Sequence, residues 1–110
     1  MKRRMKVELL YFDGCPTYKE AMKILKECVH EVDPTIRIEK IKVISNDHAR
    51  SLEFLGSPTI RINGRDIEEK AQGWKDFGLR CRVYESQEGF GGIPTKEMIL
   101  KALQRGRYHE

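Results

Sequence analysis

No apolar run in this sequence approaches the ~20 residues that a membrane-spanning helix requires, so we expect no membrane partner. The first residues, MKRRMKVELLYF, begin with basic side chains, as a signal peptide does. However, the apolar stretch contains Glu8 and ends at Asp13, and no small-residue cleavage site follows it. We therefore predict a charged lead-in to a strand and a cytoplasmic protein.

Charge of one sign does not dominate the chain. The 21 Lys and Arg residues oppose 17 Asp and Glu residues and leave a net charge of +4. The basic excess lies largely at the two ends of the sequence, and both signs are mixed in the middle. A nucleic-acid-binding protein would gather Lys and Arg on one face, with aromatic residues between them. The mixture instead predicts a solvated surface and no nucleic-acid partner.

Cysteine is scarce, with only Cys15, Cys28 and Cys81 present. An odd number of cysteines at long spacings argues against a small secreted domain held together by disulfides. There is no C-x-x-C pair and no paired set of Cys and His ligands. We therefore predict no structural zinc site and no bound cofactor.

The 110 residues present are enough for one modest core, and we predict a single domain over residues 1–110. The spacing of apolar residues, with capping and turn residues, predicts its elements. Strands are expected at residues 6–12 and 36–44 and around Ile60 and Ile62, with a hairpin turn at Asn63-Gly64, and helices at 16–32, 45–56 and 95–106.

The order of these elements is β-α-β-α-β-β-(insert)-α, which predicts an α/β fold. Strand–helix–strand units pair their strands in parallel, whereas a tight hairpin pairs them antiparallel. We therefore expect three layers, with a mixed sheet of about four strands and helices on both faces. Residues 69–93, which hold five glycines, form an insert before the last helix that is either a functional loop or partly structured.

Cys15 stands between the first strand and the first helix, in an exposed place where a core residue is not expected. A helix N-terminus carries roughly half a positive charge and unpaired N–H groups, which stabilise a thiolate. Asp13 acts in the opposite direction, because a nearby carboxylate disfavours a second negative charge. We therefore predict that the pKa of Cys15 is lowered, but not to an extreme value.

The element order, the cysteine in DGCPTY and the tripeptide SPT before the third strand together resemble the thioredoxin-like superfamily. The resemblance covers roughly residues 5–68 and 95–106, and it implies that Cys15 is the nucleophile and that Pro58 is the cis-proline beside it. It also implies that the backbone of Ser57, Pro58 and Thr59 pairs with the substrate, with Tyr18 in the same cleft. A second candidate motif, GIPT at 92–95, is followed by a helical pattern rather than a strand, so Pro58 is the better match.

The sequence departs from that family at Tyr18, which occupies the place of the second cysteine of C-x-x-C. Cys28 lies 13 residues along the same helix from Cys15, roughly 20 Å away, which is too far for a disulfide between them. It falls on the apolar stripe of the helix, so we predict that it is buried. Cys81 lies between Arg80 and Arg82 in the insert. Either the insert brings Cys81 to Cys15 as a resolving thiol, or Cys81 faces the core and the two arginines face outward.

Three functions follow as alternatives. The first is a thiol-disulfide oxidoreductase that uses Cys15, with or without Cys81 as the resolving thiol, and that acts on protein or small-molecule thiols and disulfides. The second is a soft-metal or organometal protein that uses both cysteines near Asp13, by analogy with organomercurial lyases. The third is a non-catalytic binding module of this fold. The electron donor and the oligomeric state stay open.

Overall fold

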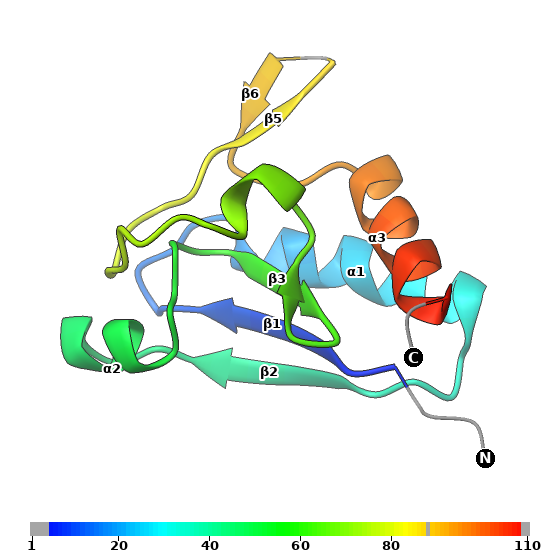
Figure 1. Ribbon diagram of the computed structural model, residues 1–110, viewed down its shortest axis with the longest axis horizontal. Helices are drawn as coiled ribbons and strands as arrows, with labels where there is room; N and C mark the ends of the chain where they lie inside the picture. The colour runs from blue at the N-terminus through cyan, green and yellow to red at the C-terminus, as the bar shows by residue number, and fades with distance from the viewer. Residues whose placement is uncertain (1–4, 88, 109–110) are drawn as a thin grey trace.

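The structure, a computed structural model, describes residues 5–87 and 89–108 (Figure 1). Its main sheet has the strand order β2-β1-β3-β4, in which β1 pairs in parallel with β2 and antiparallel with β3. The strands are β1 (Val7–Tyr11), β2 (Ile38–Lys42), β3 (Thr59–Ile62) and β4 (Arg65–Asp66). The helices are α1 (Tyr18–Val32), α2 (Asn46–Ser51) and α3 (Lys96–Tyr108). The predicted α/β fold, its mixed sheet and the order of its elements are confirmed.

Apolar side chains cover both faces of the sheet, because successive residues of β1 point to opposite sides. Val7 and Leu9 enter the larger core cluster, together with residues of α1 and α3. Leu10 enters a second cluster on the other face, with Ala49 of α2 and Phe54 just beyond it. The sheet is therefore the middle layer of three, as expected, with α1 and α3 on one face and α2 on the other (Figure 1).

The ends of α1 and α3 differ from the predicted ends. α1 begins at Tyr18 rather than at residue 16, because residues 12–15 form a turn in which the Cys15 N–H donates to the Phe12 carbonyl (3.1 Å). α3 begins after Thr95, whose hydroxyl accepts from the Met98 N–H as a predicted cap (3.1 Å).

The prediction that Gly106 ends the last helix is wrong, since α3 continues to Tyr108. Gly106 lies where the helix passes close to the sheet. A Cβ atom at this position would lie 2.7 Å from Cγ2 of Ile62 and 2.9 Å from Sδ of Met5. The glycine therefore permits close packing instead of ending the helix.

The insert, residues 69–93, is partly structured. It contains a 3₁₀ turn, η1 (Glu69–Ala71), and a hairpin of β5 (Tyr84–Ser86) and β6 (Gly89–Gly91) that stands apart from the main sheet (Figure 1). The residues between η1 and β5 return to the main domain. The Gly78 N–H donates to the Phe54 carbonyl (3.1 Å), and the Leu79 N–H donates to Asn46 Oδ1 (3.0 Å). Leu79 also packs against the second core cluster.

Across the described ranges 5–87 and 89–108, every helix is too short or too polar to cross a lipid bilayer.

Candidate active site

The Cys15 side chain lies in the turn that joins β1 to α1, two residues before the Thr17 N-cap. Only 4% of its surface is exposed, so the expectation of an exposed cysteine is wrong. The insert accounts for the burial of Cys15, because it contacts Ser57 and Thr17, the two residues beside the thiol. Its backbone pairs with Ser57, and its Gly92 carbonyl accepts a hydrogen bond from the Thr17 hydroxyl (3.1 Å).

Hydrogen bonds decide the protonation of Cys15. Burial alone would raise the pKa of this thiol, but hydrogen bonds from the Ser57 and Thr17 hydroxyls and from the backbone N–H groups of Thr17 and Tyr18 lower it further than burial raises it. Thr17 Oγ1 lies 3.5 Å from the sulfur. The predicted direction, a lowered pKa, is therefore confirmed.

Asp13 does not play the part expected of it. Its carboxylate forms an ion pair with Lys42 Nζ (2.6 Å), and it is not among the groups that shift the pKa of Cys15. Both side chains of this pair are largely exposed.

Ser57 lies beside the Cys15 thiol, on the segment that leads into β3. The Ser57-Pro58 peptide bond is cis, and both residues are buried. Among residues 5–87 and 89–108, the Ser57 hydroxyl has no hydrogen-bond partner with regular geometry. It nevertheless approaches the Cys15 sulfur closely enough to lower the pKa of that group. A buried hydroxyl of this kind is a donor that a Cys15 thiolate would satisfy.

Cys81 is the other neighbour of Ser57. The two residues form an isolated parallel β-bridge, in which the Ser57 N–H donates to the Arg80 carbonyl (2.8 Å) and the Arg82 N–H donates to the Ser57 carbonyl (2.9 Å). The Cys81 side chain is exposed. The alternative in which Cys81 faces the core and both arginines face outward is therefore wrong, because Arg82 is the buried residue of the three (4% exposed).

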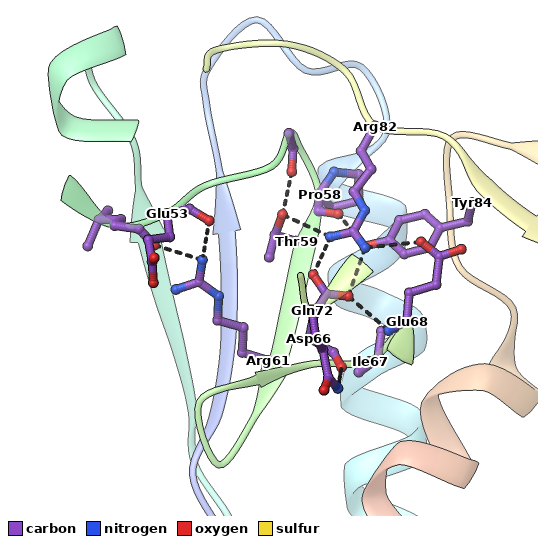
Figure 2. Close-up of polar contacts among 12 residues, drawn as sticks. Glu53, Pro58, Thr59, Arg61, Asp66, Ile67, Glu68, Gln72, Arg82 and Tyr84 are labelled. Atoms are coloured by element: carbon purple, nitrogen blue, oxygen red, sulfur yellow. Dashed lines mark hydrogen bonds and ion pairs between the residues drawn. The ribbon is translucent and has the colours of Figure 1, made fainter. Parts of the chain in front are cut away.

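Arg82 is held by a buried ionic cluster (Figure 2). Its guanidinium donates to both carboxylate oxygens of Asp66 (2.6 and 2.7 Å) and to Glu68 (3.1 Å). Burial disfavours the charged form of Arg82, but its hydrogen bonds to Asp66 and Glu68 and its electrostatic interactions with Tyr84 and Asp66 raise its pKa beyond its usual value. The carboxylates lie on and just after β4, so this cluster fixes the insert to the main sheet.

Two other residues join this cluster to the proline. The Tyr84 ring lies 4.5 Å from the Arg82 guanidinium carbon, and its hydroxyl donates to the Pro58 carbonyl (2.6 Å). Thr59, expected to contact substrate, instead donates to the Gly56 carbonyl and accepts from Arg82 (3.3 Å). No local pattern predicts the cluster, because Asp66 and Glu68 lie 16 and 14 residues before Arg82.

Tyr18 begins α1 and stacks on Tyr11, the last residue of β1, with ring centroids 4.3 Å apart. The Lys40 ammonium lies over both rings, 5.0 and 5.4 Å from their centroids. Cys28 is fully buried, as predicted, and burial raises its pKa. Within the described part of the chain, no three or more His, Cys, Asp or Glu side chains converge as a metal site would require.

The site residues can now be set against known proteins. No curated protein and no solved structure is significantly similar to this chain. One family model does match, over residues 14–103, a stretch that includes Cys15, Ser57, Cys81 and the whole Arg82 cluster. The chain therefore belongs to the family described as domain of unknown function DUF2703.

Proposed function

We propose that this protein is a thioredoxin-like thiol-disulfide oxidoreductase in which Cys15 is the nucleophile and Cys81 is the resolving thiol. One observation carries the proposal, which is that Ser57 has a cysteine on each side. Its hydroxyl approaches the Cys15 sulfur, and its backbone is bridged to Cys81.

The fold supports the thioredoxin-like assignment without a matching homologue. The strand order β2-β1-β3-β4, a cysteine two residues before the N-cap of α1 and a cis-proline immediately before β3 agree with what the resemblance implies. Pro58 rather than Pro94 carries the cis bond, in agreement with the argument that a strand must follow this motif.

The thiol chemistry follows from the two cysteines. The Cys15 thiolate attacks one sulfur of a disulfide RS–SR, forms a Cys15–SR disulfide and releases RS⁻. The Cys81 thiolate then attacks the Cys15 sulfur, forms a Cys15–Cys81 disulfide and releases the second RS⁻. The two protein thiols thereby lose two electrons and two protons, which leave as two molecules of RSH.

Distance favours Cys81 over Cys28 as the resolving thiol. Paired strands lie roughly 4.8 Å apart, and a disulfide requires Cα atoms within roughly 7 Å. Cys81 is one strand spacing from Ser57, the residue whose hydroxyl lowers the pKa of Cys15. Cys28 is fully buried in the core between α1 and α3.

The test is a disulfide map of the protein after oxidation with a small-molecule disulfide RS–SR, obtained by mass spectrometry of proteolytic peptides. We expect an intramolecular Cys15–Cys81 bond in the wild type and in the matched control Cys28→Ala. In Cys81→Ser, the same oxidant should leave Cys15 as a stable mixed disulfide. A wild-type protein in which Cys15 joins only to the small thiol, or only to a second molecule, would remove Cys81 from the mechanism.

A further inference from the structure

We propose that the disulfide substrate of Cys15 is a low-molecular-weight compound and not an extended polypeptide, because the insert permanently occupies the backbone edge beside the thiol. This inference rests on the proposed function and names its substrate class.

A polypeptide substrate reaches a sheet by hydrogen-bonding its backbone to free N–H and C=O groups at an edge. Beside Cys15, the groups that could serve are those of Ser57. Both are already used, since the Ser57 N–H donates to Arg80 (2.8 Å) and the Ser57 carbonyl accepts from Arg82 (2.9 Å). The insert therefore takes the place that a substrate strand would need.

The occupying segment is anchored on both sides of this bridge. Before the bridge, Leu79 packs against the second core cluster, and its N–H is held by Asn46 (3.0 Å). After the bridge, Arg82 is held by the buried carboxylates of Asp66 and Glu68. A segment with apolar and ionic anchors at its two ends is a fixed wall of the site.

Gly56 allows the wall to stand this close. It adopts a φ of +128°, and a Cβ atom there would lie 3.1 Å from the Arg82 Cβ and 3.2 Å from the Arg80 carbonyl oxygen. The fit between the insert and the loop before Pro58 thus depends on the missing side chain at this position.

The remaining opening to the thiol is narrow. The Cys15 side chain is 4% exposed, and both Ser57 and Pro58 are fully buried. The Ser57 hydroxyl is buried and has no regular hydrogen-bond partner among the described residues. A small disulfide needs only to bring one sulfur to the thiol, with electrons and protons transferred as in the two steps above, whereas an extended chain also needs the backbone groups of Ser57 that the insert already occupies.

Two matched probes test the inference in single-turnover reactions of the reduced full chain. The first is the mixed disulfide of N-acetylcysteine amide with thionitrobenzoate. The second carries the same mixed disulfide at the central cysteine of an extended, uncharged eleven-residue peptide. Release of the coloured thionitrobenzoate reports the rate for each probe. The ratio of the two rates is also measured with a simple thiol in solution, which shows the ratio expected when no insert covers the thiol.

We expect the protein to react with the small probe roughly thirtyfold faster than with the peptide, after correction by that ratio. This factor corresponds to displacing two backbone hydrogen bonds of about 1 kcal/mol each. Leu79→Ala, which weakens one anchor of the wall, should reduce the preference. The matched control Val83→Ala, at an exposed residue of the same segment, should retain it.

Equal corrected rates for the two probes would overturn the inference and leave the proposed function intact. A preference that Leu79→Ala does not reduce would show that something other than the wall excludes the peptide, and would also overturn it. A Cys15 that reacts with neither probe faster than the simple thiol would instead refute the proposed function.

Discussion

Cys15 and Cys28 lie at opposite ends of the same stretch of chain, and both are withdrawn from solvent, with 4% and 0% of their surfaces exposed. Their thiols nevertheless shift in opposite directions. Burial raises the pKa of Cys28, whereas hydroxyl and backbone donors lower the pKa of Cys15 in spite of burial. The difference shows that the donors around a buried sulfur, and not its burial, decide whether a thiolate forms.

The surroundings of Cys28 illustrate the opposite case. Its sulfur faces the Lys96 carbonyl oxygen (3.8 Å), an acceptor that a thiolate would repel. Lys96 favours the thiolate through its charge, but desolvation outweighs it, and Glu27 and Glu31 add to the unfavourable effect. Cys28 therefore behaves as a small apolar residue of the core.

The largest expected effect is on the pH profile of alkylation, measured for each cysteine by mass spectrometry. A lowered pKa means that the Cys15 thiolate persists as pH falls, so its alkylation should begin at a lower pH than that of a free thiol. The raised pKa of Cys28 delays its alkylation to higher pH. Cys15→Ser should abolish the low-pH reaction completely, and Cys28→Ala should leave it unchanged. If the low-pH reaction persisted in Cys15→Ser, a cysteine other than Cys15 would carry the lowered pKa.

A smaller effect is expected from Ser57→Ala, which makes the surroundings of Cys15 more like those of Cys28. Loss of a hydrogen bond to a charged group is worth about 1.5 kcal/mol at least, so the alkylation rate of Cys15 at neutral pH should fall roughly tenfold. Circular dichroism and the unfolding midpoint control for a change of fold. An unchanged rate would mean that the serine hydroxyl does not stabilise the thiolate.

The smallest effect is expected from Thr17→Val, which removes a hydroxyl shared between the sulfur and the Gly92 carbonyl and keeps the branched shape of the N-cap side chain. Thr17 Oγ1 lies 3.5 Å from the sulfur, and its hydroxyl already donates to Gly92. The alkylation rate at neutral pH should fall only roughly threefold, as for a weak hydrogen bond. A decrease larger than that of Ser57→Ala, in the same assay, would contradict the order of the two donors.

Local patterns in the sequence were sufficient for most of the fold. Alternation and helical spacing predicted the strands and helices in their correct order, and Asn63-Gly64 and Thr95 marked a turn and a cap correctly. Errors of one or two residues at the start of α1 arose from a turn that depends on one backbone hydrogen bond. Such a bond leaves no periodic signal.

The site was only partly predictable, because its unpredicted features depend on contacts between distant residues. Alternation around Cys81 suggested that the arginines face outward together, but Asp66 and Glu68 draw Arg82 into the interior. The burial of Cys15 likewise depends on where residues 80–82 and 92 return to the domain. Neither arrangement can be inferred from the spacing of neighbouring residues.

The bridge between Ser57 and Cys81 also affects the self-association of the protein. An open backbone edge recruits strands from other molecules, and a reactive thiol beside that edge would convert such an encounter into a covalent link. Because the chain pairs this edge with its own residues, two copies cannot align their backbones there. The segment that covers Cys15 thus also keeps these backbone groups from pairing with another molecule.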